Sequence, residues 1–393
     1  MFGCYRCEKD ESAHMNFGQQ EKLNLLIKKA VEKHQNGQLR VANLVYDEIL
    51  EIDHENLIAL QFKGLLAFQL NQYEFSVTLL SRAILLQPYQ ADIFNNRGSA
   101  FFELDQFDKA LSDYDQAIAL NPDYTEAFYN RGIVLRVKDR LNDALRDYRR
   151  AIELRSDHFR AYNDVGIVFH KLKKLGEALD HFNQAILIKP NYAEALNNRG
   201  VVFKELGQYE EALRDHTQAI KLQPDYVEAV NNKGLVLQKL KLFHEALTDY
   251  NRAISICSDH VDALSNRATV LQEFQKFSDA LKDYNNALFI QPNNHAVLNN
   301  RGNLLKRLGR YSESIRDYNN ALKFEPDVAE TLNNRGMAFQ ALGRYDEAVE
   351  DYDKSIFLKP EYAEPYLNKA ILMLHLGDFS SAWPLYEWRW KIE

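Results

Sequence analysis

The sequence has little cysteine, no long apolar run and no excess of positive charge. Three cysteines among 393 residues cannot form a disulfide framework, which favours a reducing compartment such as the cytoplasm. No stretch of about eighteen apolar residues occurs, so we expect no membrane-spanning helix. The first residues lack the basic start and apolar stretch of a secretory signal. The net charge of −8 argues against nonspecific binding to nucleic acid or acidic membranes.

The motifs of common catalytic sites are also missing. There is no Gly-x-x-x-x-Gly-Lys phosphate loop, no Gly-x-Gly-x-x-Gly turn and no His-Glu-x-x-His. Cys4 and Cys7, with His14 nearby, offer three metal ligands. No second Cys-x-x-Cys pair accompanies them, so a leader without metal is the favoured interpretation. We therefore expect no enzyme, no cofactor and no metal.

What the sequence does contain is a period of 34 residues. Small residues recur without insertion or deletion at Ala30, Gly64, Gly98, Gly132, Gly166, Gly200, Gly234, Ala268, Gly302, Gly336 and Ala370. Further small residues follow each of these at fixed offsets, and seven of the nine prolines share one phase of the same period. This regularity predicts a stacked repeat architecture.

Each 34-residue unit predicts two helices. In the unit 193–226, apolar residues at helical spacing indicate a first helix over about 193–206, and Gly207 supplies a left-handed stop. A second helix covers about 209–222, and Pro224 prevents its continuation. One helix pair cannot bury its apolar face alone, so successive pairs must stack on one another.

These residues resemble the tetratricopeptide repeat family. The resemblance consists of small residues at unit positions 8, 20 and 27, an aromatic residue at position 24 and proline at position 32. It covers 23–393 as eleven units, which start at residues 23, 57, 91, 125, 159, 193, 227, 261, 295, 329 and 363. Residues 1–22 are left as an extension that is poorly ordered or enters the first helix. The resemblance implies an all-α, right-handed superhelical solenoid, in which the first helix of each unit lines a concave groove.

Position 6 of the units predicts the binding site. It carries Asn96, Asn130, Asp164, Asn198, Asn232, Asn266, Asn300, Asn334 and Asn368, which we call the asparagine column. Asparagine is about 0.5 kcal/mol less favourable than alanine in a helix, so eight of them cost about 4 kcal/mol. Their amides can bond both N–H and C=O groups of an extended peptide. In arrays similar to that of O-linked N-acetylglucosamine transferase such a column binds client backbone, and the resemblance implies the same here.

Two structural explanations of the column stay open. In the first, repeats copied from one ancestor share asparagine without any selection for binding. In the second, the amides form hydrogen bonds with neighbouring repeats and with no client.

Basic residues at positions 12 and 13, among them Lys204, Lys239, Lys306 and Arg307, would favour an acidic client, although a solvated face is the simpler interpretation. Acids occupy position 2 in seven of the eleven units. This excludes the mode in which lysine at that position clamps a terminal carboxylate.

Seven units carry arginine or lysine at position 7 together with aspartate at position 23. The unit that starts at residue 159 lacks both, with Val165 and His181 instead. An unpaired charge at a half-buried position is costly, so we predict a ladder of salt bridges between the two helices of the units. The sequence leaves open whether each arginine meets the aspartate of its own unit or that of a neighbour.

Two functions compete. The first is a protein-interaction scaffold that binds extended peptide segments. The alternative is the client-recognition arm of a larger protein, because residues 377–390 resemble the closing repeat of bacterial tetratricopeptide proteins with a glycosyltransferase-like domain. Trp383, Trp388 and Trp390 in this last unit predict either self-association or a hydrophobic cap that folds back on the repeat.

Overall fold

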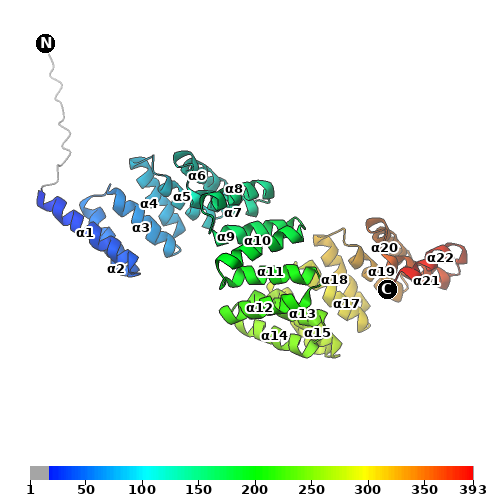
Figure 1. The fold of residues 1–393 in the computed structure, drawn as a ribbon. Helices are drawn as coiled ribbons and strands as arrows, with labels where there is room; N and C mark the ends of the chain where they lie inside the picture. The colour runs from blue at the N-terminus through cyan, green and yellow to red at the C-terminus, as the bar shows by residue number, and fades with distance from the viewer. Residues whose placement is uncertain (1–16, 393) are drawn as a thin grey trace, which may run out of the picture. The chain divides into compact units, whose positions relative to one another are not determined.

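Every predicted helix pair is present in the structure, a computed structural model that describes residues 17–392 (Figure 1). The chain divides into two compact parts, Met1–Pro190 and Asn191–Glu393, and each is described by itself. From here on these two parts are called units, and a 34-residue helix pair is called a repeat. The described part consists of helices joined by short turns and contains no strand. Residues 17–22 already belong to the first helix, whereas Cys4, Cys7 and His14 lie outside the described residues.

The unit 1–190 contains five helix pairs. The first helices of the repeats are α1 Phe17–Gln35, α3 Leu57–Gln69, α5 Ala91–Glu103, α7 Thr125–Val137 and α9 Phe159–Lys171. The second helices are α2 Leu39–Ile52, α4 Tyr73–Leu86, α6 Phe107–Leu120, α8 Leu141–Leu154 and α10 Leu175–Ile188. Each second helix packs on its own first helix, and α2, α4, α6 and α8 also pack on the first helix that follows; successive first helices touch as well. The first helices therefore form one layer of the unit.

The unit 191–393 repeats this arrangement. Its first helices are α11 Ala193–Glu205, α13 Val227–Lys239, α15 Val261–Glu273, α17 His295–Arg307, α19 Ala329–Ala341 and α21 Ala363–Leu376. Its second helices are α12 Tyr209–Leu222, α14 Phe243–Ile256, α16 Phe277–Ile290, α18 Tyr311–Phe324, α20 Tyr345–Leu358 and the short α22 Phe379–Tyr386, which continues into the 3₁₀ turn η1 Glu387–Lys391.

The turn inside each helix pair has one conformation in all eleven repeats. The left-handed residue expected at Gly207 is present there, with φ +75°. The residues one or more periods away have positive φ as well, and six of them are not glycine: Asn71, Asp105, Asp139, Lys173, Lys241 and Gln275. A side chain in this conformation costs about 1 kcal/mol. The stacking of the two helices thus imposes the turn even where the residue disfavours it.

The small residue at position 8 lies where the two helices of a repeat approach most closely. A Cβ atom built on Gly302 would stand 2.6 Å from Cε1 of Tyr318, and Gly132 meets Tyr148 in the same way at 2.7 Å. Both tyrosine rings are fully buried. Glycine or alanine on the first helix and a large ring on the second are therefore one packing feature that recurs along the chain.

The tryptophans of the last repeat do not behave alike. Trp388 folds back and stacks on Tyr366 of α21, with 3.8 Å between ring centroids and 3° between ring planes. Trp383 and Trp390 stay 55% and 76% exposed. The predicted hydrophobic cap is thus formed by Trp388 alone, and self-association through the two exposed rings stays a prediction.

Candidate peptide-binding surface

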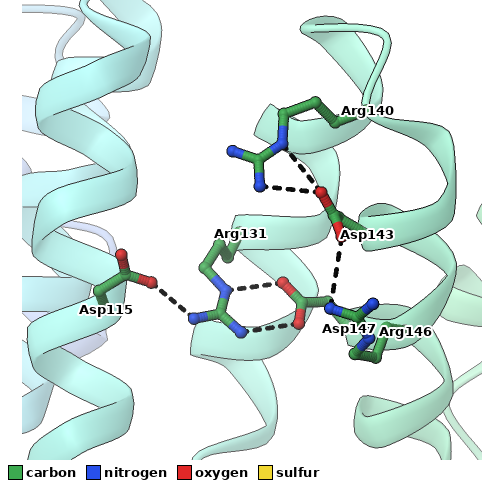
Figure 2. Close-up of polar contacts among 6 residues, drawn as sticks. All are labelled: Asp115, Arg131, Arg140, Asp143, Arg146 and Asp147. Carbon is green, nitrogen blue, oxygen red and sulfur yellow. Dashed lines mark hydrogen bonds and ion pairs between the residues drawn. The ribbon is translucent and has the colours of Figure 1, made fainter.

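The predicted salt-bridge ladder is confirmed, and each basic residue meets the aspartate of its own repeat. Figure 2 shows the pair of Arg131 and Asp147, in which Nε and Nη2 donate to the two carboxylate oxygens at 2.7 Å. The same geometry is found at 2.6–2.8 Å in Arg97–Asp113, Arg199–Asp215, Arg267–Asp283, Arg301–Asp317 and Arg335–Asp351, and Lys233–Asp249 forms a single bond at 2.8 Å. All seven aspartates are buried.

The third arm of the guanidinium reaches the preceding repeat. Nη1 of Arg131 donates to Oδ1 of Asp115 on α6 at 2.6 Å, as Figure 2 shows. Nη1 of Arg301 donates to Asn285 on α16 at 2.7 Å, and Arg97, Arg267 and Arg335 bond Ser81, Asn251 and Asn319 in the same way. Each such arginine therefore fixes the two helices of its repeat and the stacking of that repeat on its neighbour.

The repeat that starts at residue 159 has apolar and aromatic packing in place of the ladder pair. Val165 is fully buried, and His181 stacks on Phe169 at 5.3 Å between ring centroids. Burial, together with the positive charge of Arg149, lowers the pKa of His181. The base and the acid are both absent from this repeat, so neither charge is buried there without a partner.

The asparagine column forms hydrogen-bonded rungs between successive first helices. Nδ2 of the column residue donates to Oδ1 of the asparagine at position 5 of the preceding repeat. The distance is 2.9–3.1 Å in Asn130–Asn95, Asn232–Asn197, Asn266–Asn231 and Asn368–Asn333. The four position-5 asparagines are buried, and the column asparagines are half-buried. Each of these four amides therefore uses one N–H to bind the neighbouring repeat, as one of the two structural explanations states.

Asp164 keeps its rung with the direction of the bond reversed. The residue at position 5 of the preceding repeat is Tyr129, whose hydroxyl donates to Oδ2 of Asp164 at 2.8 Å. An acceptor in the column is therefore matched by a donor at position 5. This pairing of position 5 with the column was not predicted, although asparagine recurs at position 5 with the same period as in the column.

The rungs leave part of these four column amides available. Within residues 17–392 no group donates to Oδ1 of Asn130, Asn232, Asn266 or Asn368, and each retains a second N–H. Asn300 forms no hydrogen bond with another side chain in the described part of the chain. Beside the column, a cleft of about 650 Å³ is lined by residues that include Tyr129, Asn130, His158 and Arg160.

The four predicted basic residues lie on first helices of the unit 191–393. Lys204 and Lys306 are half-buried, and burial lowers the pKa of both, that of Lys306 to about 8. Lys239 and Arg307 are exposed, and the guanidinium of Arg307 lies 4.9 Å from the ring centroid of Phe277. Among the described residues no carboxylate lies within 4.0 Å of any of the four cations.

His216 stands where eight other repeats carry tyrosine, and its ring packs on Gly200. Nδ1 lies 3.1 Å from Oδ1 of Asn197, whereas Nε2 is buried with no partner in the described part of the chain. Burial, with a smaller effect of Lys204, lowers the pKa of His216 to about 3. The folded protein therefore resists protonation at this position.

We expect His216→Phe to make the protein less sensitive to acid. The unfolded chain binds a proton near pH 6.5 and the folded chain only near pH 3, so stability is complete above pH 6.5 and falls below it. The free energy of unfolding of the variant, relative to wild type, should rise by about 1.4 kcal/mol per pH unit between about pH 6 and pH 4. Urea titrations at several pH values measure this. Phe182 beside Gly166 shows that phenylalanine fits the position, and a difference independent of pH would contradict the prediction.

Between residues 17 and 392, each helix is too short or too polar to cross a bilayer. Over the same residues, no group of three or more histidine, cysteine or acidic side chains is arranged to hold a metal ion.

Comparison with known proteins places the fold among helical repeat proteins. Profiles described as TPR repeat match residues 98–137, 168–207 and 302–343, and profiles described as tetratricopeptide repeat match 193–226, 227–260 and 329–362. No curated protein matches the chain. The class defined by the fold is thus an all-helical solenoid of stacked helix pairs. The chain is a tetratricopeptide repeat protein.

One solved structure shares the fold over most of the chain, and two others are similar to part of it. The crystal structure of the APC/C hetero-tetramer Cut9–Hcn1 superposes with a TM-score of 0.56 at 14% identity, over 93% of this chain and 92% of that chain, and shows the shared fold. YrrB, described as a TPR protein with an unusual peptide-binding site, matches with a TM-score of 0.39 at 25% identity, over 47% of this chain and 95% of its own. PilF of Pseudomonas aeruginosa matches with a TM-score of 0.48 at 19% identity, over 54% and 97%.

Proposed function

We propose that the chain is a non-catalytic interaction scaffold whose asparagine column binds the backbone of an extended protein segment. The observation that carries the proposal is the unused part of the column amides. Oδ1 of Asn130, Asn232, Asn266 and Asn368 accepts no bond within residues 17–392, while the rung fixes the orientation of the amide plane. Oriented acceptors on these four repeats suit the regularly spaced N–H groups of an extended chain, whatever its side chains.

The rungs also lower the entropy that binding would cost. An asparagine that already donates one N–H to its neighbour loses little rotamer freedom when a peptide bonds its oxygen. One net hydrogen bond contributes about 1 kcal/mol, so several repeats must act together to give useful affinity. This favours an extended client over a single anchored residue. The alternative function, a recognition arm of a larger protein, uses the same surface and predicts the same peptide binding.

The test uses immobilised short unstructured peptides and their copies with N-methylated backbones. We expect the protein to capture peptides and to lose the N-methylated copies, because methylation removes the N–H donors. The triple variant Asn232→Ala, Asn266→Ala and Asn300→Ala should bind captured peptides about a hundredfold more weakly, since three bonds of about 1 kcal/mol are lost. Fluorescence anisotropy with labelled peptides measures the affinity.

Two controls separate binding from folding. Asn300 takes part in no rung, so Asn300→Ala alone should weaken capture about fivefold while the melting temperature stays unchanged. Exposed polar residues of the second helices provide the matched variant, Gln218→Ala, Asn286→Ala and Asn320→Ala, which should bind as wild type does. Equal capture by the column variant and wild type, with both folded, would show that the column serves only to join the repeats.

A further inference from the structure

The rung between α17 and α19 is interrupted although both of its amides are present. Asn299 occupies position 5 of α17 and Asn334 the column position of α19, yet no bond joins them. Oδ1 of Asn334 instead accepts a hydrogen bond from Nζ of Lys306 at 3.0 Å. Oδ1 of Asn299 is buried and has no hydrogen-bond partner among residues 17–392. A buried acceptor without a donor costs about 1–3 kcal/mol, so this site is incomplete as it stands.

Lys306 is a half-buried cation without a counter-charge. Its other contact is Sδ of Met337 at 3.5 Å, also on α19. From α18, Tyr318 donates its hydroxyl to Asn303, and on α17 itself the side chain of Arg307 turns to Phe277 of α16. Glu273 of α15 forms no ion pair with Lys306. Nothing in the described part of the protein neutralises the ammonium group.

The repeat around Lys306 favours an anionic partner. Residues 295–328 hold six lysines and arginines against four acids, although the chain as a whole carries −8. Three of those acids are engaged: Asp317 by Arg301, Glu313 by Arg310 and Glu325 by His295. A carboxylate brought by a client would therefore meet Lys306 without competition from the repeat itself.

We propose that Lys306 anchors a carboxylate of an acidic extended segment, and that this contact completes the interrupted rung. The ammonium group gives up its hydrogen bond to the amide oxygen of Asn334 and forms an ion pair with the carboxylate. The released amide of Asn334 then turns and donates Nδ2 to Oδ1 of Asn299, as column amides do in four other repeats. Every polar group of the site is satisfied in the bound state. The inference rests on the proposed function and adds the chemical class of the segment.

The lowered pKa of Lys306 gives the site a pH dependence that an exposed lysine would not have. Burial lowers this pKa to about 8 in the free protein, and a bound carboxylate would raise it again. Binding therefore takes up a proton above pH 8. The affinity for an acidic peptide should then fall about tenfold per pH unit from about pH 8 upward, until the pKa of the bound lysine is reached.

The experiment compares two unstructured peptides, one with glutamate at alternate positions and one with glutamine in their place. We expect wild type to prefer the glutamate peptide at least tenfold at pH 7, and to lose this preference progressively between pH 8 and pH 9.5. Lys306→Met should bind both peptides equally at every pH. Lys306→Arg should keep the preference without the pH dependence, because guanidinium stays charged.

The outcomes separate this inference from the function on which it rests. Equal affinity of wild type for both peptides overturns the role of Lys306 and leaves the backbone-binding column intact. A preference that survives in Lys306→Met also overturns it, since another cation would then be responsible. Failure of wild type to bind either peptide, together with failure to capture any peptide in the N-methylation experiment, overturns the column function and the inference together.

Discussion

Replacing Arg301 with alanine is expected to lower the free energy of unfolding by about 3–5 kcal/mol. Asp317 is only 3% exposed, and both of its oxygens accept from Arg301 at 2.7 Å. Removal of the guanidinium leaves a buried carboxylate without a counter-charge, which is among the most destabilising single changes. The variant also loses the bond from Nη1 to Asn285 on α16 and thereby a contact between repeats.

Urea unfolding measures the total loss, and hydrogen exchange of the amides in α17 and α18 shows whether the loss is local. The control is Arg310→Ala, because Arg310 pairs with Glu313 at the surface, where an ion pair contributes little. Arg301→Met combined with Asp317→Leu should recover most of the stability, since an apolar pair of similar size avoids the unpaired charge. An alanine variant as stable as wild type would show that the ladder does not hold the helices together.

Replacing Gly302 with leucine is the second change with a large expected effect, a loss of about 3 kcal/mol. A Cβ atom alone would stand 2.6 Å from Cε1 of Tyr318. The ring has no room to retreat, because it is fully buried and its hydroxyl donates to Asn303 at 2.7 Å. Extra atoms in a packed interior force the helices apart and cost about 1–3 kcal/mol or more.

Gly302→Ala is the matched control, and it should change the free energy of unfolding by less than about 1 kcal/mol. The repeat 261–294 carries Ala268 opposite Tyr284, so a methyl group fits when the helices shift slightly. The better helix propensity of alanine, about 1 kcal/mol, offsets that shift. Thermal unfolding of both variants checks the comparison. A leucine variant as stable as the alanine variant would mean that the helix crossing is not close-packed.

The asparagine column shows how far sequence reasoning reached into the site. The period places all nine column residues on the first helices, and the structure has them there. Their bonds to position 5 could not be read from the sequence, since an amide has two donors and two lone pairs whose partners depend on the spacing of neighbouring helices. The exchange of Asn for Asp164 is explained only by Tyr129, which stands 35 positions before it.

The sequence by itself determined the architecture, because helix length, turn position and the place of each small residue follow from local conformation repeated every 34 residues. It also determined that position 7 and position 23 form ion pairs, since neither charge tolerates burial alone. Only the tertiary structure decided which aspartate each arginine meets, which amides form hydrogen bonds with one another, and that Lys306 donates to Asn334 rather than to a carboxylate. These choices depend on how side chains of two adjacent repeats divide a few hydrogen bonds between them, and that division is a property of the packed helices rather than of the pattern along the chain.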